Sequence, residues 1–130
     1  MSEENVEIVR RVYERWARGD FSNVDDFDPD IEFEMADWPH QTKVTGIEAM
    51  WETWRSTLGA FEGFRSMATE FTAVGDNVLV LNRIEASGKE SGAGVGADVA
   101  SLFTLRNGKV TRLALYWDVD AARREAIAQG

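Results

Sequence analysis

Cysteine is absent from this chain of 130 residues, so the sequence predicts neither a disulfide framework nor thiol chemistry. Proline is rare, with two residues, and histidine occurs once, at His40. No stretch approaches about 18 uninterrupted apolar residues, the minimum for a helix that spans a bilayer. The sequence therefore predicts neither a disulfide-stapled domain nor a membrane span.

Basic residues are also scarce, with 14 Lys and Arg against 23 Asp and Glu and a formal net charge of −9. Nucleic acids and anionic membrane surfaces are bound by clustered Lys and Arg, so neither is an expected partner. The first residues include Glu3 and Glu4 and lack the basic and apolar regions of a signal peptide. We therefore expect a cytoplasmic protein.

Aromatic side chains are abundant, with five Trp and seven Phe. Each large aromatic side chain brings roughly 150–250 Å² of surface that favours burial. A thin core can be filled with less aromatic surface than this, so some of the aromatic side chains could line a cavity. The chain length fits one domain over residues 1–130.

Helical periodicity is clearest near the start of the chain, where apolar residues recur at spacings of three and four: Val9, Val12, Tyr13 and Trp16. This pattern predicts a helix over 3–18. A short second helix is expected to begin at Asp20 and to end at Pro29. Further helices are predicted over 46–62 and 119–128.

Alternation of apolar and polar residues predicts five strands, over 31–35, 64–74, 77–87, 97–106 and 109–117. The alternation in the second of these is irregular, which indicates a β-bulge. Asn107-Gly108 is the strongest hairpin signal, because both turn positions favour positive φ. The order α-α-β-α-β-β-β-β-α predicts the α+β class.

Six short segments spread over nearly the whole chain carry a recurrent pattern: 4–13, 18–21, 28–30, 45–47, 104–110 and 116–118. Together they resemble the nuclear-transport-factor-2-like superfamily, in its SnoaL-like and ketosteroid-isomerase-like branch. The resemblance implies a cone-shaped barrel in which three to four helices cup a strongly curved, mixed and mostly antiparallel sheet around a pocket. It also implies a homodimer through the convex sheet face, here expected at Arg83, Glu85, Arg112 and Tyr116.

Ketosteroid isomerases of this branch carry a Tyr on the first helix, an Asp after the first strand and a second acid on a late strand. Ungapped matching places Val12, Met35 and Ser101 at these positions. All three functional groups are lost, so isomerase chemistry of that type is not expected.

Limonene-epoxide hydrolases hold a water molecule with carboxylates and an Arg, and the nearest equivalents here are Arg83 and Glu85. Strand phase argues against this interpretation, because the apolar alternation of residues 78–86 turns Asn82 inward and both charged residues outward. We interpret them as a charge ladder on the solvent or dimer face.

Three residues are candidates for catalysis. His40 could act as a general base oriented by Asp37, or it could be an exposed loop histidine. Asn82 could orient a ligand carbonyl group, or it could bond Ser101 across the sheet, since a buried amide needs a partner. Asp118 is interpreted as a helix cap.

The predicted pocket wall combines apolar and polar side chains, each of which could instead be ordinary core: Tyr13, Trp16, Met35, Trp38, Trp51, Trp54, Asn82, Ser101, Phe103 and Trp117. No metal site and no cofactor are predicted. The preferred function is a pocket protein that binds a small, apolar, cyclic molecule. The alternatives are an acid–base enzyme, such as an isomerase, cyclase or epoxide hydrolase, and a dimerisation scaffold without a ligand.

Overall fold

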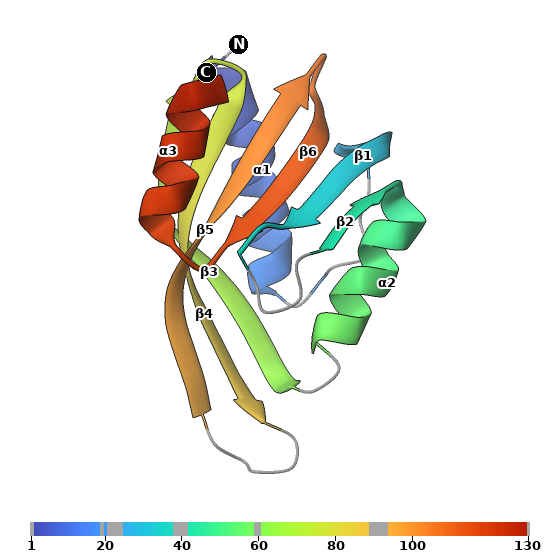
Figure 1. Ribbon diagram of the computed structural model, residues 1–130, viewed down its shortest axis with the longest axis vertical. Coiled ribbons are helices and arrows are strands. Elements are labelled where there is room, and N and C mark those ends of the chain that lie inside the picture. The colour runs from blue at the N-terminus through green and yellow to red at the C-terminus, as the bar shows by residue number, and fades with distance from the viewer. Residues whose placement is uncertain are drawn as a thin grey trace.

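A computed structural model describes residues 2–18, 20, 25–37, 42–58, 61–88 and 94–129 (Figure 1). Three helices and six strands follow one another in these residues: α1 (Ser2–Ala17), β1 (Phe27–Met35), β2 (Thr42–Thr45), α2 (Ile47–Leu58), β3 (Phe61–Val74), β4 (Asn77–Gly88), β5 (Gly94–Arg106), β6 (Lys109–Tyr116) and α3 (Val119–Gln129). The described helices are too short or too polar to cross a membrane.

The strands form one mixed sheet in the order β2-β1-β6-β5-β4-β3. Only β1 and β6 run parallel, and every other neighbouring pair is antiparallel. The sheet is strongly twisted, and the β4–β5 hairpin extends beyond the body of the molecule (Figure 1). The predicted α+β architecture is confirmed, but the sheet is open: β2 and β3 are its edges and do not close a barrel.

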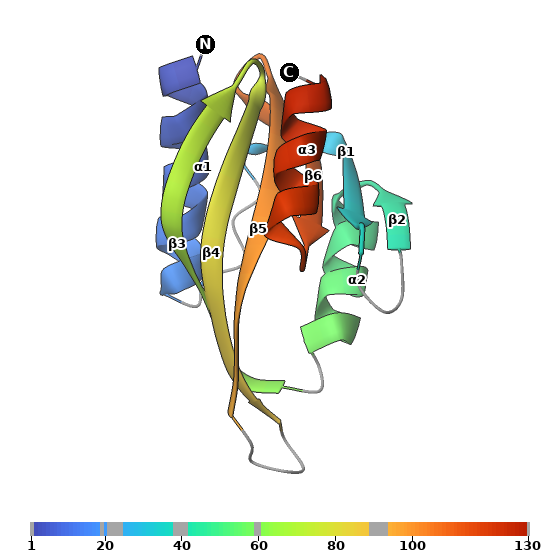
Figure 2. The same cartoon turned by 60° about the vertical axis from the view of Figure 1, so that its left-hand side comes forward.

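The two faces of the sheet are covered by different helices (Figure 2). On the inner face, α1 packs against β3 and β4 while α2 packs against β1 and β2. These contacts enclose the larger core, which contains most of the buried aromatic side chains. On the outer face, α3 covers β4, β5 and β6 through small residues such as Ala122 and Ala126.

The predicted second helix is wrong where the structure describes it. Residues 25–26 form a turn, and Phe27 already begins β1, while residues 21–24 lie outside the described residues. Burial of Phe27 beside Val110 of β6 outweighs the local preference for a helix. Pro29 is tolerated because the pairing of β1 with β6 is irregular between Phe27 and Glu32.

The predicted hairpin turn and the predicted bulge are confirmed. Asn107 and Gly108 have φ values of 54° and 77°, as a two-residue hairpin turn requires. The pairing of β3 with β4 shifts register between Ala68 and Glu70. Strand β2 was not predicted, because its four residues are too few to show a clear alternation.

Asp118 caps α3, and its Oδ1 atom accepts hydrogen bonds from the backbone N–H groups of Asp120 at 2.9 Å and Ala121 at 3.3 Å. The helix-cap interpretation of this residue is therefore confirmed. The cap also directs α3 back over the outer face of the sheet directly after β6.

Of the four residues expected at a dimer interface, two lie on the outer face and two are engaged in contacts within the chain. Arg83 and Glu85 lie on the outer face beyond α3, and the Arg83 guanidinium lies over Gly96, where a Cβ atom would be 2.5 Å from Nη2. Arg112 pairs with Glu34 of the same chain at 3.0 Å. Tyr116 is buried in the cluster beneath α3. The homodimer stays a prediction, with Arg83 and Glu85 as its accessible part.

Truncation of a side chain in the inner core should lower the free energy of unfolding much more than truncation of an exposed side chain. Phe103 is fully buried, so Phe103→Ala should lower the free energy of unfolding by about 3–5 kcal/mol. Ile127→Ala, at a side chain that is 72% exposed, should change it by less than about 0.5 kcal/mol. Urea denaturation followed by circular dichroism measures both values. Equal losses for the two variants would contradict the assignment of the core.

Candidate ligand-binding pocket

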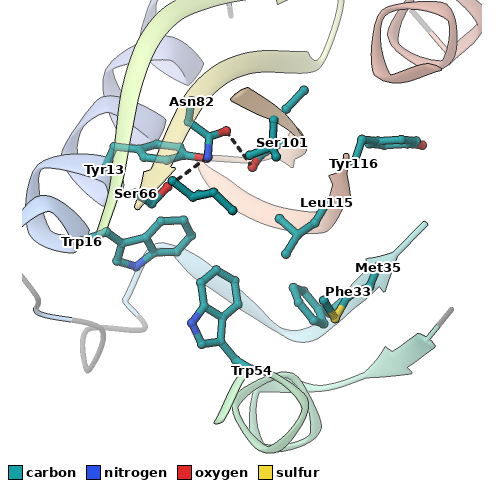
Figure 3. A pocket seen from close by; sticks show the side chains of 13 residues that line it. Tyr13, Trp16, Phe33, Met35, Trp54, Ser66, Asn82, Ser101, Leu115 and Tyr116 are labelled. Atoms are coloured by element: carbon teal, nitrogen blue, oxygen red, sulfur yellow. Dashed lines mark hydrogen bonds between the residues drawn. The ribbon is translucent and has the colours of Figure 1, made fainter. Parts of the chain in front are cut away.

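A pocket opens between the inner face of the sheet, α1 and α2, and it is lined mostly by apolar side chains (Figure 3). Four aromatic rings form an arc along its wall: Tyr13, Trp16, Trp54 and Phe33, with successive centroid distances of 5.0, 5.2 and 5.8 Å. The enclosed cavity has a volume of about 30 Å³, and the empty space reaches about 480 Å³ only when the open solvent at its mouth is included. The hollow is therefore narrow, and its enclosed part has room for about two water molecules.

Polar groups gather at one end of this pocket (Figure 3). The Asn82 Nδ2 group donates to Ser66 Oγ at 3.0 Å, and the Ser101 hydroxyl donates to Asn82 Oδ1 at 3.4 Å. All three residues are buried. The chain of hydrogen bonds satisfies the Asn82 amide oxygen and one of its two N–H groups.

Strand register brings these three residues together. Asn82 of β4 lies opposite Ala68 of β3 and Val99 of β5, so Ser66 and Ser101 are its diagonal neighbours on the same face. Diagonal neighbours lie within reach of polar side chains. The predicted inward direction of Asn82 is thus confirmed, and of its two interpretations the bond to Ser101 is the one present in the structure.

Tyr13 contributes a fourth polar group. Its hydroxyl is buried, and the Ser101 side chain is close enough to act on it as a hydrogen-bond partner, although the separation is too long for a full hydrogen bond. Burial raises the pKa of Tyr13 far above its usual value near 10, and Ser101 opposes that shift only in part. The phenol consequently stays protonated throughout the physiological range and can act as a hydrogen-bond donor.

Tyr116 touches the pocket from the opposite side, while its ring points away from the polar end (Figure 3). Burial raises the pKa of Tyr116, the charge of Glu125 adds to the effect, and Arg112 opposes it. The side chain links the pocket wall to the cluster beneath α3.

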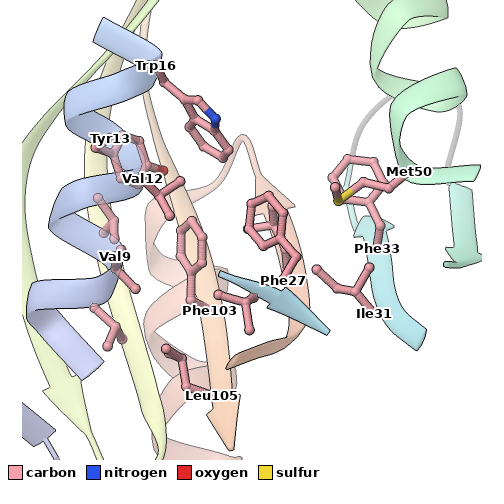
Figure 4. Packing of buried hydrophobic residues seen from close by; sticks show 14 of the residues in the cluster. Val9, Val12, Tyr13, Trp16, Phe27, Ile31, Phe33, Met50, Phe103 and Leu105 are labelled. Carbon is pink, nitrogen blue, oxygen red and sulfur yellow. The ribbon is translucent and has the colours of Figure 1, made fainter. Parts of the chain in front are cut away.

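Six of the predicted wall residues line this pocket: Tyr13, Trp16, Met35, Trp54, Asn82 and Ser101. Phe103 lies behind the wall instead, in the core beside Val12 (Figure 4). Trp51 is half-buried and packs edge-on against Trp54 at 6.2 Å, outside the lining. Trp117 is also half-buried and outside the lining.

The proposed catalytic pair has no described geometry, because His40 lies outside the described residues, as does Trp38. Asp37 has a structural partner: its carboxylate accepts hydrogen bonds from the backbone N–H groups of Trp117 at 2.7 Å and Asp118 at 2.9 Å. This interaction ties the end of β1 to the segment between β6 and α3.

Ser66 is a member of the polar end of the pocket that sequence reasoning missed. It occupies an edge strand whose alternation is interrupted by bulges, so its direction could not be inferred from its neighbours. The irregularity was visible, but only pairing with β4 shows that Ser66 faces inward. Six further lining residues were likewise not predicted: Phe33, Ile84, Val99, Ala100, Leu115 and Tyr116.

Comparison with known proteins places the chain in a family. The SnoaL-like domain family matches residues 9–113, which is most of the sequence. The chain belongs to the SnoaL-like domain family. No curated protein matches this SnoaL-like chain.

Solved structures agree on the fold of this SnoaL-like domain. An NTF2-like protein of unknown function from Burkholderia pseudomallei K96243 is 18% identical, with a TM-score of 0.78 and coverage of 93% of this chain and 95% of that one. TerC, co-crystallised with polyporic acid, is 23% identical, with a TM-score of 0.78 and coverage of 96% and 98%. An LEH-like epoxide hydrolase from M. tuberculosis is 20% identical, with a TM-score of 0.70 and coverage of 99% and 92%.

The buried phenol predicts an alkaline transition of this SnoaL-like domain. An unfolded Tyr ionises near pH 10, whereas folded Tyr13 keeps its proton, so above that pH the folded state binds more protons than the unfolded state. Stability should therefore fall as the pH rises above about 10. Phenolate absorbance should show Tyr13 ionising only as the protein unfolds.

Tyr13→Phe is the matched control, because it removes the late ionisation and leaves that of Tyr116. The variant should also lose part of the alkaline destabilisation. Reversible ionisation of both tyrosines near pH 10 in a protein with a native circular dichroism spectrum would show that Tyr13 is not buried in solution.

Proposed function

We propose that this SnoaL-like domain binds a small, flat, largely apolar ring compound in the aromatic pocket. The observation that carries this proposal is the arc of Tyr13, Trp16, Trp54 and Phe33 around a hollow that side chains do not fill. Well-packed interiors contain few voids, and binding pockets are mostly apolar with a small number of polar groups. An aromatic-walled hollow with polar groups at one end fits a ligand site better than a packing defect.

The chemistry of the lining favours binding over acid–base catalysis. Among the described residues that line the pocket there is no Asp, Glu, His, Lys or Arg. General acid–base catalysis needs a group that gains and loses a proton near the working pH. Tyr13 does not gain and lose a proton near neutral pH, because burial raises its pKa. We therefore place binding ahead of isomerase, cyclase or hydrolase activity.

The proposed binding should be visible in tryptophan fluorescence. Trp16 and Trp54 both line the pocket, so titration with flat bicyclic and tricyclic hydrocarbons should change their emission in a saturable way. Val99→Phe places a ring in the hollow from a buried lining position and should weaken binding at least about tenfold, which is about 1.4 kcal/mol.

Thr72→Phe is the matched control, because it adds the same ring to an exposed position of β3 away from the lining. This variant should bind as the wild type does. Absence of a saturable response across the panel, or equal weakening in the two variants, would count against the pocket as the binding site.

A further inference from the structure

The enclosed part of the pocket is too small for the ligand class proposed above. It measures about 30 Å³, which is room for about two water molecules. An apolar cavity that takes up a single benzene ring measures roughly 150 Å³. A ring compound therefore enters only if part of the wall moves, and most of the wall is held in place.

The aromatic arc is held by its own contacts. Tyr13, Trp16, Trp54 and Phe33 stand ring against ring at successive centroid distances of 5.0, 5.2 and 5.8 Å. Behind them, the ring of Phe103 lies 5.8 Å from Tyr13 and 6.3 Å from Trp16. Displacement of one ring would break contacts with several others in a closely packed core. The arc is therefore a fixed side of the pocket.

The side chains on β3, β4 and β5 are also restrained. Asn82 is hydrogen-bonded on both sides, to Ser66 and to Ser101. Ile84 and Val99 are β-branched, which restricts rotation about χ1. This part of the wall has little freedom to make room for a ligand.

Met35 differs from the rest of the wall. Among the described lining residues it is the one with an unbranched thioether side chain and three rotatable bonds. It is 4% exposed and lies across the pocket from Asn82 and Ser66 (Figure 3). Methionine fills irregular gaps in apolar surroundings and adapts its shape to them. Met35 is therefore the lining side chain best able to vacate space for a ring.

The backbone at Met35 is fixed, so only its side chain is free to move. Met35 pairs with Thr42 of β2 on one side and with Leu115 of β6 on the other. The Ala36 N–H group donates to the Leu115 carbonyl oxygen at 3.0 Å. The Asp37 carboxylate is hydrogen-bonded to the segment between β6 and α3. A change at this position is consequently a rotation of the thioether.

We infer that Met35 is the gate of the pocket: its thioether occupies space that a ring would take, and its rotation out of the hollow determines how large a ring the pocket admits. A buried Met side chain gives up apolar contacts when it moves, so an already open pocket would bind a ring more tightly. This inference rests on the proposed ligand-binding function and names the residue that limits the size of the ligand.

Two substitutions at Met35 should change ring binding in opposite directions. Naphthalene is the probe, and the shifts of the Trp16 and Trp54 indole N–H signals in NMR spectra give its dissociation constant. Met35→Ala removes the thioether and should strengthen naphthalene binding about tenfold. Met35→Ile keeps an apolar side chain but stiffens it at χ1, and it should weaken binding at least about tenfold. The gain for Met35→Ala should be smaller with toluene, whose single ring needs less space.

Met50 provides the matched control, because it is a buried methionine of the same core that lies outside the pocket lining. Met50→Ala and Met50→Ile should lower the melting temperature but change naphthalene affinity by less than about twofold. Equal changes in affinity at the two positions would show that general core packing controls binding, and they would overturn the gate.

The ε-methyl signals of methionine report on the gate in the wild-type protein. Met35 lies in the pocket wall, Met50 in the core and Met67 on the surface, so their signals compare three environments. Saturation with naphthalene should shift the Met35 methyl signal strongly and leave the other two nearly unchanged. An unmoved Met35 signal beside shifted Trp16 and Trp54 signals would contradict the inference.

Failure of the gate differs from failure of the proposed function. If naphthalene binds the wild type and both Met35 variants equally well, the gate is wrong and ring binding stands. If it binds neither the wild type nor Met35→Ala, while near-ultraviolet circular dichroism shows both to be folded, gate and proposed function are both wrong. If it binds Met35→Ala alone, the thioether blocks the pocket permanently, which also contradicts both. Should Met35→Ile fail to fold, Met35→Ala and the methyl signals decide.

Discussion

The two-residue alternation of the central strands is the constraint on which the pocket depends. Because β3, β4 and β5 pair in a single register, Ser66, Asn82 and Ser101 meet on the inner face. A slip of one residue in β4 would turn Asn82 toward α3 and bring Arg83 into an apolar pocket. Burial of α3 on one face and of the aromatic arc on the other makes such a slip costly.

The polar end of the pocket combines satisfied and unsatisfied groups in one small volume. The Asn82 amide is hydrogen-bonded on both sides, which links the three strands. The Tyr13 hydroxyl is buried without a partner, which costs stability. Proteins tolerate such departures from good packing mainly at functional sites. The paired amide therefore supports the three strands, whereas the unpaired phenol contributes no such support.

Membership in the SnoaL-like domain family explains the architecture of this chain and leaves its chemistry to the individual side chains. The positions matched to the two ketosteroid-isomerase acids hold Met35 and Ser101, and both line the pocket here. The alternative set of Arg83 and Glu85 faces away from it. The same scaffold thus encloses a pocket whose described walls are uncharged. This is the physical reason for placing the proposed binding ahead of acid–base catalysis.

Local patterns in the sequence were enough to predict α1, the Asn107-Gly108 hairpin, the capped start of α3 and the inward direction of Asn82. Each of these depends on residues a few positions apart, within one helical turn or one strand. Long-range pairing decided the rest. Phe27 began a strand because it pairs with Val110 of β6, and Ser66 turned inward because β3 pairs with β4 across bulges. Asp37 became a structural acceptor for Trp117. Which aromatic side chains surround the hollow, and which only fill the core behind it, followed from the same packing of distant segments.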